Sequence, residues 1–366
     1  MRIIRPLLVI ICLLAVLGTT APVHAADRIQ IIDSSARVNF PMEITFKLAA
    51  KSAFPITDIR LRYNIDQISF ASVTSESYIE FKSDVNVDVN WTLDMRKTGG
   101  WSPGTRMTYW WVLTDSSGAD KMQTEPITLT YEDQRFSWQS VTDGQVTVHY
   151  YFGGPLFARD MLSSANQGLK KMAGDSGITL MRPINIYLYN SQDDLLGALV
   201  FPHGWEGAVS YFNFAVIIAF IPMYNIPWGK ASLNHEISHQ FTYQLTRNAY
   251  SYIPIWLNEG LAMYAQGDMG NILNGKLRDA VKSHKLLSIK SLASPFSNDT
   301  ELANLGYAES YNLVDFLINS YGQGKMMELL ATFKQGITSD DALKKIYDTD
   351  TEGLDLLWQK YIIPKM

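Results

Sequence analysis

The chain has 366 residues and a formal net charge of −5, and 18% of its side chains are charged while 12% are aromatic. This mild acidity argues against a nucleic-acid partner, because such partners require a basic surface. A chain of this length and low charge content is expected to form about two globular domains with well-buried cores.

Residues 1–26 have the pattern of a signal peptide. Arg2 and Arg5 precede an apolar run from Leu7 to Leu17, and Val23-His24-Ala25 is a small-residue cleavage site. This run of 11 residues is too short to span a bilayer, which needs about 20. We therefore expect an exported protein (secreted, periplasmic or at the cell surface) with no stable membrane span after cleavage. Retention of the uncut segment as an anchor stays open.

The single cysteine, Cys12, lies inside this signal segment. The mature chain is therefore expected to contain no thiol. This excludes disulfides, cysteine nucleophiles and cysteine metal ligands from it.

The region 27–135 has the pattern of β-strands. Apolar and polar residues alternate over 59–65 and again over 85–93, which is typical of half-buried strands. The segments 107–113 and 122–131 flank a turn cluster and predict a hairpin. Strands joined by short turns predict an antiparallel β-sandwich of immunoglobulin-like or fibronectin-like type.

The region 145–366 combines strands with helices. Strands are predicted over 145–151 and 184–189, with an amphipathic helix over 156–173 between them. The segment 206–221 is strongly apolar, but Asn213 interrupts it and it is too short for a membrane span, so we expect a buried strand there. Helices are predicted over 230–243, 256–266, 274–284, 306–320, 325–335, 339–347 and 354–361.

Two motifs on the first two of those helices indicate a metal site. His235 and His239 are four residues apart, so a helix places both imidazoles on one face, and Glu236 lies beside them. Glu259 follows on the next helix. Two imidazoles and one carboxylate leave the fourth position of a tetrahedral zinc open, which is typical of catalytic sites. The pattern predicts one Zn²⁺ held by His235, His239 and Glu259, with Glu236 as the general base.

The sequence LNHEISHQF (Leu233–Phe241) followed by PIWLNEGLAMY (Pro254–Tyr264) resembles the gluzincin zinc metallopeptidases. Within them it is most similar to the bacterial peptidase-MA-like family, which is related to the M1 aminopeptidases. The resemblance covers about residues 145–366. It implies an α+β protein in which the N-terminal β-sandwich precedes a thermolysin/M1-like catalytic domain with a helical C-terminal lobe. It also implies an edge strand within 206–221, beside which an extended peptide binds.

Tyr307 is the expected hydrogen-bond donor to the oxyanion, because a tyrosine at the start of the corresponding helix has this role in M1-like relatives. Tyr311 lies one turn later and is the competing candidate, and a purely structural role for both stays open. Asn258 precedes the ligand Glu259 as in relatives. It either orients a zinc ligand or caps the second helix.

The chain departs from better-known relatives at two points. M1 aminopeptidases carry Gly-Ala-Met-Glu-Asn, whose Glu binds the substrate amine, whereas this chain has Trp205-Glu206-Gly207-Ala208 in that stretch. Thermolysin-like enzymes place an Asp four residues after the third ligand, where this chain has Met263. Recognition of a free amine is therefore in doubt, and a brace for a zinc-bound histidine must come from elsewhere.

The function that these observations predict is hydrolysis of peptide bonds by Glu-assisted attack of a zinc-bound water, on a peptide or protein substrate. Two alternatives stay open. One is a surface binding protein in which the β-domain does the work and the zinc lobe is a scaffold. The other is a zinc hydrolase that acts on a non-peptide bond.

Overall fold

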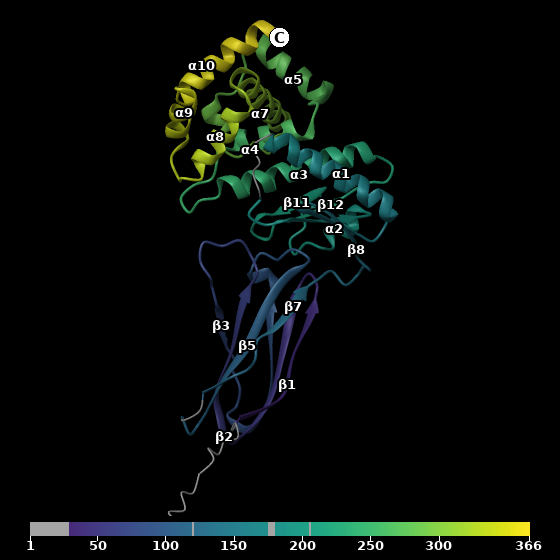
Figure 1. The fold of residues 1–366 in the computed structure, drawn as a ribbon, viewed down its shortest axis with the longest axis vertical. Coiled ribbons are helices and arrows are strands. Elements are labelled where there is room, and N and C mark those ends of the chain that lie inside the picture. Colours follow the sequence, from purple (N-terminus) through teal and green to yellow (C-terminus); the bar gives the residue numbers. More distant parts are fainter. Residues whose placement is uncertain (1–28, 119–120, 175–179, 205) are drawn as a thin grey trace, which may run out of the picture.

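The structure is a computed structural model, and it describes residues 29–118, 121–174, 180–204 and 206–366. The predicted signal peptide and its cysteine lie outside the described residues. Figure 1 shows an elongated molecule with the N-terminal strands at one end, the C-terminal helices at the other, and a second sheet between them. The limits 27–135 and 145–366 for two domains stay predictions.

The N-terminal region is a seven-stranded sheet in which every strand pairing is antiparallel, so the expected antiparallel β-architecture is confirmed. Its strands are β1 (Ile29–Asn39), β2 (Glu43–Ile65), β3 (Ser75–Tyr78), β4 (Asp84–Asp94), β5 (Thr105–Asp115), β6 (Lys121–Gln123) and β7 (Ile127–Tyr131). The predicted hairpin corresponds to β5 with β6 and β7, because β5 pairs with both.

The long strand β2 joins the two halves of this sheet. Its first half pairs with β1 and β4, and its second half pairs with β3 and β5. The register shifts near Ile56, where the partners change. Ile44, Phe46 and Leu48 are fully buried while the residues between them are not, as expected for a strand with one face on a core.

The second sheet has five strands in the order β11-β12-β10-β9-β8. They are β8 (Gln139–Asp143), β9 (Val146–Tyr150), β10 (Ile184–Tyr189), β11 (Ala208–Tyr211) and β12 (Val216–Phe220). The central strand β10 runs parallel to β9 and β12, whereas β11 is an antiparallel edge strand that pairs with β12. The apolar segment 206–221 is therefore a hairpin, and it supplies the edge strand that the sequence predicted.

Both faces of this second sheet are buried. On one face, Ile186 and Leu188 share a core with α1 (Gly154–Ala173) and α3 (Ile226–Thr246), which cover the sheet (Figure 1). On the other face, Tyr187 and Tyr189 share a core with the N-terminal sheet. The phenol of Tyr189 donates to Asp133 Oδ2 at 2.9 Å, so the two regions are joined by polar as well as apolar contacts.

The C-terminal part is helical, as predicted (Figure 1). Among the described residues, none of the helices has the length and apolar character needed to cross a membrane. The remaining helices are α2 (Gln192–Leu196), α4 (Ile255–Gln266), α5 (Gly270–Lys282), α6 (Ile289–Leu292), α7 (Thr300–Tyr321), α8 (Gln323–Phe333), α9 (Ser339–Tyr347) and α10 (Thr351–Ile362).

The start of α7 differs from the prediction of 306–320. Asp299 caps this helix by accepting hydrogen bonds from the N–H groups of Glu301 and Leu302, so the helix begins two turns earlier. Gly306 is an interior position of α7, where a Cβ would lie 3.1 Å from the ring of Phe296. The glycine serves packing there, and the expectation that Tyr307 opens this helix is wrong.

Candidate metal centre

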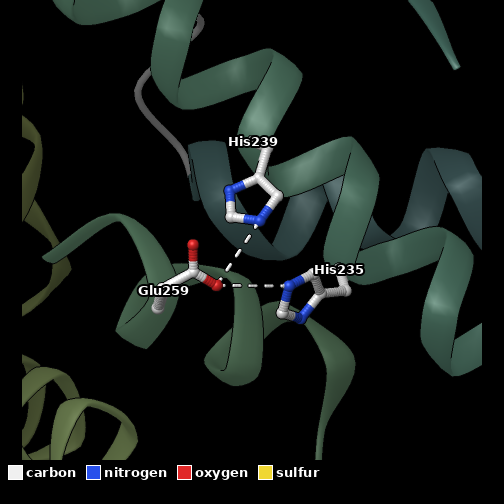
Figure 2. Close-up of side chains that lie close together, drawn as sticks. All are labelled: His235, His239 and Glu259. Carbon is white, nitrogen blue, oxygen red and sulfur yellow. Dashed lines mark ion pairs between the residues drawn. The ribbon is translucent and has the colours of Figure 1, made fainter. Parts of the chain in front are cut away.

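Helices α3 and α4 bring the two sequence motifs together. Asn225 caps the N-terminus of α3 by accepting a hydrogen bond from the N–H of Trp228. This helix carries His235 and His239. The loop after α3 then turns the chain, and Glu259 lies in the second turn of α4. Figure 2 shows the two imidazoles and the carboxylate converging on one point.

The ligand atoms of these three residues all lie within 4.8 Å of one another. Nε2 of His235 is 3.5 Å from Oε2 of Glu259, and Nε2 of His239 is 3.6 Å from the same oxygen (Figure 2). Two ligands of a tetrahedral zinc with bonds of about 2.0–2.1 Å are separated by about 3.3 Å, so this donor set fits zinc in both chemistry and spacing.

The Nδ1 atom of each imidazole, on the opposite side of the ring from the ligand atom Nε2, contacts a side-chain amide oxygen. Nδ1 of His239 lies 3.2 Å from Oδ1 of Asn258, and Nδ1 of His235 lies 3.3 Å from Oε1 of Gln266. Because an amide oxygen only accepts, each Nδ1 carries the hydrogen and each Nε2 lone pair is left for a metal. Of the two roles open for Asn258, the geometry favours orientation of His239, since the N-cap of α4 is Pro254.

The position that the thermolysin comparison singled out, Met263, is buried in the core and offers no brace. Gln266 takes up that task for His235, and it was not among the residues predicted for the site. A signal was present, because Gln266 follows Glu259 by seven residues, which is two helical turns on the same face.

The charges of the site favour a protonated histidine next to a carboxylate when no metal neutralises them. Burial by itself lowers the pKa of His235, but the hydrogen bond to Glu259 and the charges of Glu236 and Glu259 outweigh it and raise that pKa. Burial raises the pKa of Glu259, and the two histidines reverse this and lower it. A cation is therefore the natural occupant of the point where the three side chains meet.

Glu236 contacts the edge strand of the second sheet. Its Oε2 accepts a hydrogen bond of 2.7 Å from Oγ of Ser210, which lies in β11. No sequence pattern points to Ser210, because this contact joins positions 26 residues apart on different elements. The candidate base is therefore hydrogen-bonded to β11, the strand at the edge of the second sheet.

Tyr307 and Tyr311 differ in what surrounds their hydroxyls. Burial raises the pKa of Tyr307, and the charges of Glu259 and Glu236 raise it further. Burial also raises the pKa of Tyr311, but the charges that act on it belong to Asp315 and Asp268. The carboxylates that act on Tyr307 are therefore those of the candidate ligand and the candidate base, whereas those that act on Tyr311 belong to other residues.

Gly260 allows α7 to approach the site. A methyl group at this position would collide with the carbonyl oxygen of Ser310 and with the side chain of Val314, both on α7. Gly260 follows Glu259 directly, so this close packing holds α7, which carries Tyr307, against the helix that carries Glu259.

Two further histidines contact residues outside the His235, His239 and Glu259 cluster. His149 is hydrogen-bonded to Asn185 at 3.0 Å and stacks on Tyr187. His203 contacts Glu206, whose Oε1 accepts from the ring Nδ1 and from the backbone N–H of His203. Burial raises the pKa of Glu206, but these and further backbone hydrogen bonds lower it to about 2.

Comparison with known protein families gives a match to this chain. The model of the peptidase MA superfamily matches residues 164–364, which include both motifs and Tyr307. No curated protein matches the chain.

Solved structures with detectable likeness are distant. An M1 zinc metallopeptidase from Deinococcus radiodurans is 11% identical, with a TM-score of 0.39, and the match covers 88% of this chain and 90% of that one. OgpA from Akkermansia muciniphila is 11% identical with a TM-score of 0.22, over 28% of this chain and 27% of OgpA. A structure described as BhCBM56 is 9% identical with a TM-score of 0.20, over 26% of this chain and 88% of that one.

Proposed function

The chain belongs to the peptidase MA superfamily, and we propose that it is a zinc-dependent metallopeptidase that hydrolyses peptide bonds. The single observation that carries the proposal is the convergence of His235, His239 and Glu259 on one point (Figure 2). Glu236 is the next residue after His235 on α3. The predicted signal peptide extends the proposal to an exported enzyme.

His235, His239 and Glu259 are the residues that would hold the zinc ion. When bound, zinc lowers the pKa of water at the site and polarises the scissile carbonyl. Asn258 and Gln266 keep both imidazoles in the tautomer and orientation that this requires.

Glu236 is the general acid and base of the proposed reaction. Its carboxylate takes a proton from the attacking water and later delivers it to the leaving nitrogen. The hydroxyl of Tyr307 donates a hydrogen bond to the oxyanion that forms on the carbonyl oxygen, and burial keeps this hydroxyl protonated.

The edge strand β11 is the proposed platform for the substrate backbone. Among the described residues β11 pairs only with β12, so one row of its backbone N–H and C=O groups remains for an extended peptide. Because Ser210 of β11 is hydrogen-bonded to Glu236, a peptide on this edge passes next to the base. Backbone pairing favours broad sequence tolerance.

The proposal is tested with the mature protein and a complex peptide library, with cleavage sites determined by mass spectrometry. We expect cleavage by the zinc-loaded protein, none after chelation, and recovery on addition of zinc. The Glu236→Gln variant, which retains every metal ligand, should bind zinc and leave the library intact.

The two alternatives give different results in the same design. A surface binding protein would retain peptides without cutting them and would be indifferent to Glu236→Gln. A zinc hydrolase of non-peptide bonds would leave the library intact but turn over ester substrates in a Glu236-dependent way.

A further inference from the structure

A cleft of about 320 Å³ lies where the N-terminal region meets the end of β11. One wall is the segment that joins β2 to β3, including Phe70. The other wall contains Asn213, which follows β11, together with Tyr243 and Arg247 at the end of α3 and Tyr252 in the loop beyond it.

The cleft is in line with the proposed substrate path. Ser210 of β11 contacts Glu236 of α3, and further along α3 the phenol of Tyr243 donates to Oδ1 of Asn213, just after β11, at 2.5 Å. Glu236 and Tyr243 are seven residues apart on α3, which is about 10 Å along a helix. An extended peptide covers this distance in about three residues.

The wall that comes from the N-terminal region is fixed in place. The guanidinium of Arg182 binds both carboxylate oxygens of Asp66, at 2.8 and 3.0 Å. The backbone N–H of Ile68 donates to the carbonyl oxygen of Asn213 at 2.6 Å. The first contact attaches the β2–β3 segment to the residues before β10, and the second attaches it to the turn after β11. The two walls of the cleft are therefore joined by direct hydrogen bonds.

The chemistry of the cleft is cationic and polar. Arg247 is the one charged residue among the described residues that line it. Its guanidinium carbon lies 3.5 Å from the ring centroid of Phe70, and its Nε donates to the hydroxyl of Tyr243 at 3.1 Å. Within the described ranges, no carboxylate lies at ion-pair distance from Arg247. A guanidinium positioned in this way, with further N–H donors, matches a carboxylate.

We infer that this cleft binds a carboxylate of the substrate about three residues from the scissile bond, so the N-terminal region takes part in substrate selection. The inference rests on the proposed peptidase function. The carboxylate has two sources, an Asp or Glu side chain and the C-terminus of a short peptide, and both present the same group to Arg247.

The test uses matched peptides that differ only in Glu or Gln, three residues before or after the cleaved bond. A second pair has a free or an amidated C-terminus at the same spacing. We expect kcat/KM to favour the carboxylate by about 10- to 100-fold in one of these pairs, the range for a hydrogen-bonded charge pair. The pair that responds identifies the source and the direction of the peptide.

Arg247→Gln should reduce this preference to about one, and Arg247→Lys should retain part of it. The control is Arg159→Gln, an exposed arginine on α1, which should retain the full preference. Thermal unfolding of each variant establishes that it is folded.

Equal kcat/KM within every pair, with peptides that are readily cleaved, overturns the inference and leaves the peptidase function standing. A preference that survives Arg247→Gln also overturns it. If no peptide is cleaved, the proposed function fails. The cleft is then judged by the Kd of the same peptides, where tighter binding of the carboxylate member supports the inference and equal Kd values overturn it.

Discussion

Oγ of Ser210 lies 2.7 Å from Oε2 of Glu236 and donates a hydrogen bond to it. The contact joins the edge strand β11 to the helix that carries both candidate histidine ligands. It fixes the orientation of the carboxylate and leaves Oε1 for another partner. One hydrogen bond therefore fixes the base relative to the strand that would bind the substrate backbone.

Loss of a single ligand should release the metal. His235→Ala or His239→Ala leaves two protein ligands, which hold zinc poorly, so we expect the zinc content to fall towards zero. Glu236→Gln should retain about one zinc per chain while turnover is lost, because the ligands are intact and the base is absent. Elemental analysis of purified protein gives the readout, and full zinc content in the double His variant would refute this ligand set.

Asn258 should contribute to metal affinity without touching the metal. Its Oδ1 fixes Nδ1–H of His239, and removal of such a partner typically costs about 10- to 100-fold in affinity. We expect a loss of this size for Asn258→Ala in a competition titration with a zinc chelator, and recovery in Asn258→Asp, which retains an acceptor. Asn271→Ala on the exposed side of α5 is the control. Unchanged affinity in Asn258→Ala would assign this residue a purely structural role.

The sequence was sufficient for features that depend on local spacing. The i, i+4 pair His235 and His239 and the alternating strands follow from the periods of helix and strand. The third candidate ligand, Glu259, follows from the second motif and its distance along the chain. The start of α7 was mispredicted because Gly306, which resembles a helix boundary in the sequence, makes room for a ring from another segment.

Contacts between elements that are distant in the chain could not be predicted from the sequence pattern. Ser210, Gln266 and the Arg247–Phe70 pair become relevant only after the sheet, the helices and the N-terminal region are packed. Their residue types are common, and no spacing rule connects Phe70 to Arg247. The burial of both faces of the second sheet also depends on the docking of the N-terminal region onto Tyr187 and Tyr189.

Tyr307 should affect turnover and leave the metal in place. Tyr307→Phe removes one oxyanion donor, so we expect kcat to fall about 100- to 1,000-fold with unchanged zinc content and thermal stability. Tyr311→Phe is the matched control, because the carboxylates whose charges raise the pKa of Tyr311 are those of Asp315 and Asp268 and not those of the site. Full activity in Tyr307→Phe with loss in Tyr311→Phe would reverse this assignment.

Glu309 should make the protein less stable as the pH rises. It is fully buried on α7, and burial raises its pKa from 4.5 to about 8 although Leu287 N–H donates to it. Because the pKa of Glu309 is higher in the folded state than in the unfolded state, protonation of Glu309 stabilises the folded protein. This contribution to the free energy of unfolding is complete below pH 4.5 and is lost as the pH rises to about 8. The loss is on the order of a few kcal/mol in the free energy of unfolding.

Glu309→Gln replaces this acid by a neutral side chain of similar shape. We expect the variant to be more stable than the parent at pH 8, with a flatter pH profile between pH 5 and 8, measured by urea unfolding at several pH values. Glu125→Gln on the surface is the control. A Glu309→Gln profile that parallels the parent would show that Glu309 ionises normally in the folded protein.

Cleavage should not require a free substrate N-terminus. Glu206, the carboxylate that the sequence offered for binding an amine, is buried, and its Oε1 is occupied by two hydrogen bonds from His203. Gly207-Ala208 matches the start of the Gly-Ala-Met-Glu-Asn pattern, and the Glu position of that pattern then falls on Ser210. A serine hydroxyl carries no charge to hold an ammonium group, and an unpaired ammonium is costly to desolvate.

We therefore expect N-acetylated peptides to be cut about as well as free ones, measured as kcat/KM on matched pairs. Activity confined to free N-termini and lost in Glu206→Gln would instead assign Glu206 to amine recognition and make the enzyme an aminopeptidase.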